Sequence, residues 1–241
     1  MSIPRLNKHT VVFRKLLYML KSSFYITYAF LMTTGTITFI EALRTTDPHV
    51  RNILNLETCI SIVAAFFYAR FMTELYEDSP EQSQEEKALT EEQHASIIRT
   101  RYIDWSITTP IMLLVLLMVL VRNDATKTIP FAKYVVILAL NYAMLGLGFL
   151  GETGQIPLLA SNATGFLSFA GMFAYIHRHF VRAQFDDKLV FWLFAGVWSL
   201  YGVAQLLHPT SRNLAYNGLD LVAKCFVGIF LWAYFTRVFR V

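Results

Sequence analysis

The chain has 241 residues, 55% of them hydrophobic, with a mean hydropathy of +0.45 and a formal net charge of +4. Apolar stretches of about 20 residues, the length that a helix needs to cross a bilayer, take up nearly the whole chain and exclude a second, soluble domain. The positive net charge indicates contact with lipid headgroups. It does not indicate binding of nucleic acid, because aromatic and basic residues do not alternate in any patch.

Seven such stretches follow one another along the chain. They predict an all-α protein, a seven-transmembrane helix bundle in the lipid bilayer of the plasma membrane of the producing cell or its host. Residues 22–241 are expected to form this single membrane domain. The predicted spans are residues 22–43, 50–75, 97–121, 129–150, 156–180, 189–208 and 213–239.

The N-terminal segment, residues 1–21, precedes the first span. It is not expected to be a signal peptide, because Arg14, Lys15 and Lys21 break its apolar part. Residues 9–21 could form a basic amphipathic helix at the membrane surface. Basic residues gather in the segments that are cytoplasmic when the N-terminus is outside. We therefore predict an extracellular N-terminus and a cytoplasmic C-terminus, although the basic N-terminal segment opposes this orientation.

A long external loop, residues 76–96, follows the second span and is rich in Asp and Glu. Its polar composition predicts a solvated segment. Calcium binding is conceivable for so many carboxylates, but the loop lacks the Asp/Asn ladder and central glycine of an EF-hand. The histidines are scattered near the ends of the spans, so we predict no metal site.

Two charged residues open the third span, where RYIDWSITTP (101–110) precedes an apolar run. A charge at the centre of a bilayer costs about 2.5–3.5 kcal/mol or more, so it needs a partner. The seventh span carries Lys224 near its middle and Asp220 four residues earlier, on the same helix face. One interpretation is a buried salt bridge that only joins helices. The other is chemical, because a buried amine can form a Schiff base with an aldehyde, and Asp104 with Asp220 would be its counter-ions.

Four motifs then resemble those of the microbial (type 1) rhodopsins, in the same order and over all seven spans. RYxDWxxTTP lies on span three and LDxxAK on span seven. AMLGLGFLG (143–151) on span four is similar to the glycine-rich helix that contacts retinal in bacteriorhodopsin, and WSLYG (198–202) on span six is similar to the family's W-x-x-Y-P. The resemblance implies a light-absorbing protein with all-trans retinal as its cofactor.

The resemblance also implies a role for individual residues. Retinal would be linked to Lys224, and Asp104, Asp220, Arg101 and Thr108 would form the region of the counter-ion and proton acceptor, with Arg101 on its extracellular side. The side chains implied around the chromophore are Trp105, Thr109, Met112, Met144, Gly148, Trp198 and Tyr201.

Several positions depart from the outward proton pumps of this family. Val115 stands where those pumps usually carry a carboxylate that returns a proton to the Schiff base, and Arg212 stands in place of the proton-release glutamate of bacteriorhodopsin. On span six, Gly202 replaces the usual proline and Gln205 a tryptophan. These departures weaken the interpretation as a pump without excluding it.

Other polar residues inside the predicted spans favour an ion pathway, since intramembrane ionisable residues usually face the bundle interior or a water-filled cavity. IEALRT, NLETCIS and YNxLDxxAK resemble the viral and algal rhodopsins of the channelrhodopsin type. We therefore predict a light-gated channel for cations (H⁺, Na⁺, K⁺ and possible Ca²⁺) along helices one, two, three and seven. The alternatives are a light-driven outward proton pump, a sensory photoreceptor, and purely structural roles for the two glutamates. The predicted pathway residues are Glu41, Glu57, Asn55, Asn213 and Asn217.

A hydrogen bond between Thr109 on span three and Asn141 on span four is predicted to set how fast the conducting state closes. The sequence shows no catalytic triad or metal cluster, so we expect no enzymatic activity. The resemblance implies a homo-oligomer, since members of the family form dimers, trimers or pentamers.

Overall fold

The structure is a computed structural model that describes residues 8–76, 91–122, 128–182 and 184–236. These residues form helices and no strand, which confirms the all-α prediction. In chain order the helices are α1 (Lys8–Arg44), α2 (Pro48–Tyr76), α3 (Glu91–Val121), α4 (Phe131–Glu152), α5 (Leu158–Phe180), α6 (Phe185–Gln205), α7 (Pro209–Asp220), the π-helical turn η1 (Leu221–Phe226) and α8 (Val227–Thr236).

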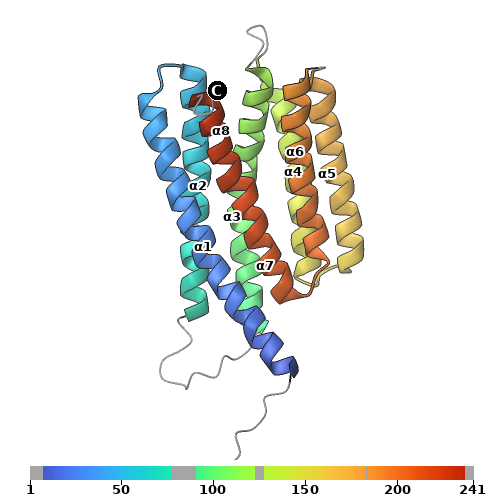
Figure 1. Cartoon of the computed structure of the whole chain (residues 1–241). Coiled ribbons are helices and arrows are strands. Elements are labelled where there is room, and N and C mark those ends of the chain that lie inside the picture. The colour runs from blue at the N-terminus through green and yellow to red at the C-terminus, as the bar shows by residue number, and fades with distance from the viewer. Residues whose placement is uncertain (1–7, 77–90, 123–127, 183, 237–241) are drawn as a thin grey trace, which may run out of the picture.

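Because α7, η1 and α8 join without a break, the described residues form seven continuous helices that run alternately up and down the bundle (Figure 1). We call the end at which α1, α3, α5 and α7 begin the lower end, as in Figure 1, and the opposite end the upper end. Within the described residues, six of these helices are long and apolar enough to cross a membrane. The exception is α6, whose first turn holds Asp186 and Asp187.

Most helix boundaries lie close to those of the predicted spans, and the two large differences are at the starts of α1 and α3. Residues 9–21 are helical as predicted, but they continue directly into the first span and do not form a separate helix. Residues 91–96 belong to α3, so the loop is shorter than predicted. The rest of that loop, including its calcium-binding question, lies outside the described residues. Which end faces the cytoplasm stays a prediction.

Asp47 explains why α2 begins where it does. Its carboxylate accepts hydrogen bonds from the backbone N–H groups of His49 (2.8 Å) and Val50 (3.3 Å), and Pro48 occupies the first helical position. Partial burial alone would raise the pKa of Asp47. These two hydrogen bonds and the nearby Arg122 guanidinium outweigh it and hold the pKa below its usual value.

Pro110 lies inside α3 and has no N–H to donate to the carbonyl of Ser106. The hydroxyl of Tyr142 on α4 donates to that carbonyl instead, at 3.0 Å, and Tyr134 donates to the carbonyl of Pro110 at 2.9 Å. Since lipid cannot satisfy a free backbone carbonyl, these bonds explain why α3 tolerates the proline and why α4 lies beside it.

The apolar core fills the upper half of the bundle between α3, α5 and α6. Val115, Leu116 and Leu117 on α3 pack there against Phe173 on α5 and Trp198 on α6, all buried. A second apolar cluster joins α1 and α2. Buried charged and polar side chains occupy the space toward α7 and η1, which is where the candidate site lies.

Candidate functional site

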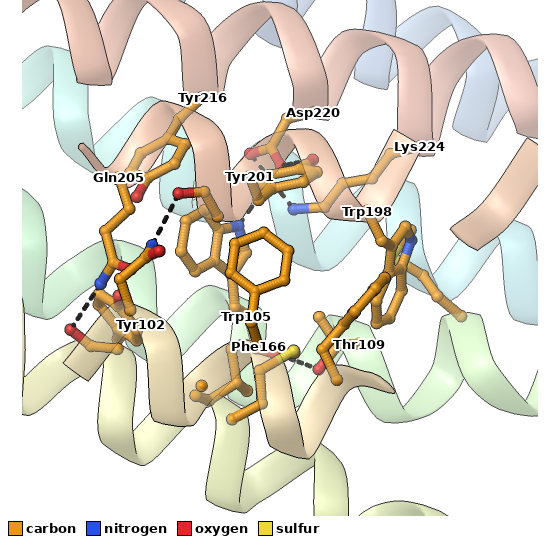
Figure 2. Close-up of a pocket in the computed structure, with 18 residues that line it drawn as sticks. Tyr102, Trp105, Thr109, Phe166, Trp198, Tyr201, Gln205, Tyr216, Asp220 and Lys224 are labelled. Carbon is orange, nitrogen blue, oxygen red and sulfur yellow. Dashed lines mark hydrogen bonds and ion pairs between the residues drawn. The ribbon is translucent and has the colours of Figure 1, made fainter. Parts of the chain in front are cut away.

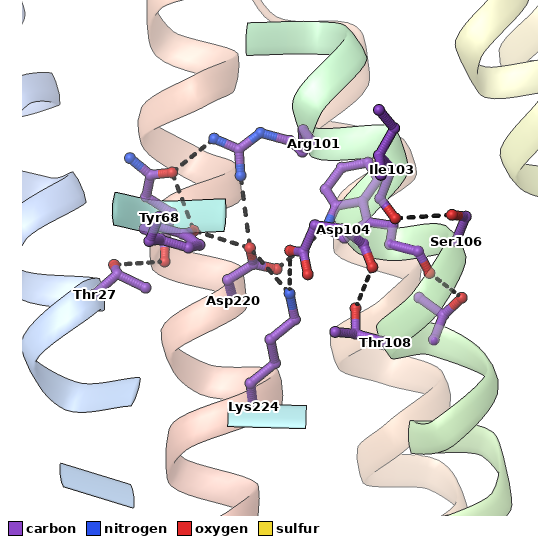
Figure 3. Close-up of polar contacts among 12 residues, drawn as sticks. Thr27, Tyr68, Arg101, Ile103, Asp104, Ser106, Thr108, Asp220 and Lys224 are labelled. Carbon is purple, nitrogen blue, oxygen red and sulfur yellow. Dashed lines mark hydrogen bonds and ion pairs between the residues drawn. The ribbon is translucent and has the colours of Figure 1, made fainter. Parts of the chain in front are cut away.

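Lys224 lies in η1, between α7 and α8. A π-helical turn is wider than an α-helical one, and such turns occur frequently at functional sites. The Lys224 side chain crosses from η1 to α3, where its Nζ atom donates a hydrogen bond of 2.7 Å to Oδ2 of Asp104. A second carboxylate oxygen, Oδ2 of Asp220, lies 3.5 Å from the same Nζ. The amine therefore lies between two carboxylates (Figure 3).

Burial makes this arrangement costly unless its charges balance. Lys224 is 1% exposed, and Asp104 and Asp220 are completely buried. Arg101, also 1% exposed, supplies the second positive charge, with its Nη1 atom 3.6 Å from Oδ2 of Asp220. Two cations and two anions thus share one desolvated cluster, which is the condition under which buried charges persist. This explains why α3, a helix long and apolar enough to cross a membrane, carries Arg101 and Asp104.

Asp220 has three aromatic donors that the sequence patterns did not single out as a set. The hydroxyl groups of Tyr68 on α2 and Tyr201 on α6 each donate to it at 2.8 Å. The indole N–H of Trp105 on α3 donates at 3.4 Å. Asp104 differs, because its Oδ1 atom is buried without a hydrogen-bond partner among the described residues. The hydroxyl of Thr108 donates to the backbone carbonyl of Asp104 and leaves the carboxylate unaffected.

Arg101 is held on the lower side of the two aspartates. Its Nη2 atom donates to the side-chain carbonyl of Asn217 at 2.8 Å, and its guanidinium carbon lies 4.9 Å from the centre of the Phe71 ring. Asn217 in turn donates to the hydroxyl of Ser23 on α1 at 2.8 Å. The cluster therefore connects α1, α2, α3 and α7, and a change at Lys224 can reach all four helices.

A cavity extends from Lys224 and Asp220 between α3, α4, α5 and α6 (Figure 2). All seven side chains predicted around the chromophore line it: Trp105, Thr109, Met112, Met144, Gly148, Trp198 and Tyr201. An elongated apolar ligand with an aldehyde at one end fits this space, because aromatic and apolar walls surround it and a buried amine stands at its end. The predicted retinal site therefore matches the residues present.

The positions where span six departs from the family motifs lie in the same cavity. A Cβ atom at Gly202 would collide with the ring of Phe166, so the glycine allows that ring to pack directly against α6. The amide of Gln205 donates to the carbonyl of Gly148 at 3.1 Å and accepts a bond of 2.8 Å from Asn162. These amides tie α4, α5 and α6 together at the lower end of the cavity.

The structure brings the predicted gating pair together. The amide nitrogen of Asn141 on α4 donates to the hydroxyl of Thr109 on α3 at 2.9 Å, and both side chains are buried. Thr109 donates in turn to the carbonyl of Trp105 at 2.7 Å. Through Trp105 this pair is connected to the wall of the cavity.

The five predicted pathway residues do not form one ring. Glu57 is 2% exposed and faces α1 and α8, whereas Asn55, two residues earlier, lies on the exposed face of α2 because positions two apart on a helix point in different directions. Asn55 is therefore not part of a buried pathway. Glu41 lies near the upper end of α1 beside Arg44, at 3.9 Å. Asn217 belongs to the Arg101 cluster, and Asn213 is buried nearer the lower end of α7.

Glu57 is the most unusual of these residues. No hydrogen bond or ion pair to it occurs among the described residues. Its Oε2 atom and the Cγ2 atom of Thr34 would both lie 2.9 Å from a Cβ atom at Gly228, so the glycine makes room for them against α8. The buried hydroxyl residues Thr38, Thr58 and Ser61 lie in the same interface of α1 and α2.

One buried carboxylate was missed by the sequence patterns. Glu152 closes α4, its side chain is 2% exposed, and it forms an ion pair of 3.0 Å with Arg212 on α7. Tyr102 and Tyr216 also donate to it. In the sequence, Glu152 is only an acidic residue at the end of an apolar span, which is common at helix ends. The partners of Glu152 lie 50 or more residues away along the chain.

Comparisons with known proteins point in one direction. The model of a family described as "Bacteriorhodopsin-like protein" matches residues 19–238. The crystal structure of the viral rhodopsin OLPVRII is similar, with a TM-score of 0.81 and 45% identity, over 92% of this chain and 99% of that one. A blue light-absorbing proteorhodopsin from Med12 has a TM-score of 0.70 at 19% identity, over 89% of this chain and 96% of that one, which is a likeness of fold alone.

A curated relative is more distant. The blue-light absorbing proteorhodopsin of Gamma-proteobacterium Hot 75m4 is 24% identical over 151 residues. The match spans 55% of this chain and 59% of that protein, so it covers less than two thirds of the relative's length.

Proposed function

Because the chain belongs to the family of bacteriorhodopsin-like proteins, which are light-driven retinal proteins of the membrane, we propose that it is a light-gated cation channel. Retinal bound at Lys224 would supply absorption of light and a change of shape inside the cavity. The chain's own residues would hold the positive charge at Lys224, orient it between Asp104 and Asp220, and pass its movement to the neighbouring helices.

The two aspartates suit different tasks. Asp220 accepts three hydrogen bonds from aromatic side chains and lies beside two cations, Arg101 and Lys224. Asp104 has one direct donor, Lys224, and an oxygen without a partner among the described residues. Asp104 is thus the carboxylate that would take a proton from Lys224, while Asp220 would hold Arg101.

The observation that carries the channel is the row of buried polar side chains between α1, α2 and α7–α8. It begins with the half-buried Ser23 and the buried Thr27 and Asn217 in the lower half. It continues with Thr34, Glu57 and Ser61, which are all buried. A buried carboxylate without a cation partner is costly in a membrane, and intramembrane carboxylates of this kind mark ion pathways. Polar groups of this kind replace part of the water shell of a passing cation.

The upper half of α3 offers little to a pump. Val115 is completely buried among Leu116, Leu117 and other apolar side chains. A carboxylate that could return a proton to Lys224 from the upper end is therefore missing from this position. A pump would need another donor, and for that reason the channel is the function that the described geometry favours.

Voltage clamp under illumination separates the two functions. A channel dissipates ion gradients, so its photocurrent should reverse sign near the equilibrium potential of the permeant cation and shift when external Na⁺ or K⁺ is replaced. An outward proton pump would give a current that stays outward across the same voltages, and that result would overturn the channel.

The variant Glu57→Gln tests the polar row. It should reduce the current or change its cation selectivity and leave the visible absorption band unchanged, because Glu57 does not line the retinal cavity. Glu74→Gln is the matched control, since Glu74 lies on the same helix and pairs with Arg70 outside the row. A Glu57→Gln channel with the parental conductance and selectivity would remove Glu57 from the pathway.

A further inference from the structure

Two cavities approach each other at the lower end of the bundle. The first is the retinal cavity, and Tyr102, Gln205 and Tyr216 lie together at one end of it (Figure 2). The second is a cavity of about 700 Å³ at the lower end of α3, α4 and α7, lined by Glu152 and Arg212 among others. We call it the lower vestibule.

No lining residue is shared between the two cavities, and on each of three helices their lining residues are separated by one helical turn or less. On α3 Tyr102 lines the retinal cavity and Ile98 the vestibule. On α4 Gly148 lines the retinal cavity, and Phe149 and Glu152 line the vestibule. On α7 Tyr216 lines the retinal cavity, and Asn213 and Arg212 line the vestibule. Four residues of helix rise about 6 Å, so the wall between the cavities is at most about one turn thick.

A single carboxylate holds this wall together. Glu152 accepts hydrogen bonds from the hydroxyl of Tyr102 at 2.9 Å and from that of Tyr216 at 2.8 Å, both at its Oε1 atom. Its Oε2 atom lies 3.0 Å from Nη1 of Arg212. The two hydroxyl groups come from the retinal side and the arginine from the vestibule side. Glu152 thus joins α3, α4 and α7 at the point where the cavities are closest.

We propose that Tyr102, Glu152, Arg212 and Tyr216 form a closed gate between the lower vestibule and the retinal cavity, and that this gate controls the access of water and small polar solutes to Lys224. Hydrogen bonds to a charged group in a desolvated site are strong, which keeps the gate shut in the resting protein. Loss of one hydroxyl group would weaken the gate without removing its charges. The proposal rests on the proposed retinal linkage at Lys224.

The test is the rate at which hydroxylamine bleaches the pigment in the dark. Hydroxylamine converts bound retinal to its oxime and frees the Lys224 amine, so the rate measures how often a small polar solute reaches that site. We expect Tyr102→Phe and Tyr216→Phe to bleach about tenfold faster than the parent, since a hydrogen bond to a charged group contributes this much to an opening equilibrium. Glu152→Gln should bleach faster as well.

Tyr134→Phe is the matched control. Tyr134 also joins α4 to α3 through its hydroxyl, but near the upper end and outside both cavities. Equal bleaching rates for the parent and all three gate variants would overturn the gate and leave the retinal linkage intact. Faster bleaching that Tyr134→Phe shares would also overturn it, because general loosening would then explain the result. A parent protein that stays colourless with retinal would instead refute the proposed function, and the gate with it.

Discussion

Asp104 and Asp220 are equally buried, but they accept different numbers of hydrogen bonds from neighbouring side chains. Asp220 accepts from Tyr68, Tyr201 and Trp105, whereas Asp104 depends on Lys224 for its direct hydrogen bond. Removing one member of a buried ion pair leaves an uncompensated charge, which costs more than the pair contributed. At the scale of single residues, Lys224 therefore has a structural role as well as a chemical one.

The first prediction concerns the stability of the retinal-free protein. Lys224→Ala leaves two buried carboxylates against Arg101 alone, and we expect a loss of about 3–5 kcal/mol and a clearly lower melting temperature in detergent. Adding Asp104→Asn restores charge balance and should recover part of that loss. Neither variant should form a visible band with retinal. If the Lys224→Ala protein had the same melting temperature as the parent, the ion pairs of this cluster would not stabilise the fold.

At the scale of elements, α3 and α4 are joined by side chains that compensate for Pro110. Tyr142 and Tyr134 donate to backbone carbonyls on α3. Asn141 donates to the hydroxyl of Thr109, the residue directly before Pro110. The Asn141 bond is the only one of the three that ends on a side chain, and that side chain lines the retinal cavity. A change of shape in the cavity can therefore break this bond and leave the backbone bonds intact.

We predict that Asn141→Ala changes the lifetime of the conducting state. Hydrogen bonds between membrane helices contribute on average about 0.6 kcal/mol and at most about 1.7 kcal/mol. If the bond is lost on opening, the closing rate should change by about 3- to 20-fold, measured from the decay of the photocurrent after a light pulse. Asn52→Ala, at an exposed position of α2, is the control. An unchanged decay would remove the pair from the mechanism.

Hydropathy predicted the helices because each span has to be apolar along most of its length. The motifs of spans three and seven predicted the Lys224 cluster, since a membrane tolerates such charges only in balance. Tyr68 and Glu152 could not be predicted in this way. A tyrosine in an apolar helix, or an acid at the end of one, is ordinary, and their partners lie on helices distant in the sequence. The sequence pattern also did not distinguish the buried face of α2 from the exposed face, on which Asn55 lies.

At the scale of the whole molecule, ion pairs fasten both ends of the bundle. Glu152 and Arg212 join α4 to α7 at the lower end. At the upper end, Arg122 at the close of α3 lies 3.3 Å from Asp47 in the turn between α1 and α2, and 4.4 Å from the centre of the Phe235 ring on α8. Arg122 thus connects the end of α3 to the turn between α1 and α2 and to α8 at the upper end of the bundle.

Asp47 offers a test of that upper contact, because its two roles can be separated. Asp47→Asn keeps an oxygen that can cap α2 but removes the charge, whereas Asp47→Ala removes both. For a pair this exposed, the charge contributes about 0–1 kcal/mol, and the cap about 0.5–2 kcal/mol. Asp47→Ala should therefore lower the melting temperature more than Asp47→Asn.

The contribution of the charge should also depend on pH. The pKa of Asp47 is lowered in the folded protein, so the stabilisation is present above the ordinary value of 3.8 and is lost as the pH falls through the folded pKa. A double-mutant cycle of Asp47→Asn with Arg122→Gln, measured by thermal unfolding, should give a coupling energy at pH 7 that falls toward zero well below pH 3.8. A coupling energy near zero at both pH values would mean that Arg122 holds the upper end through Phe235 and not through Asp47.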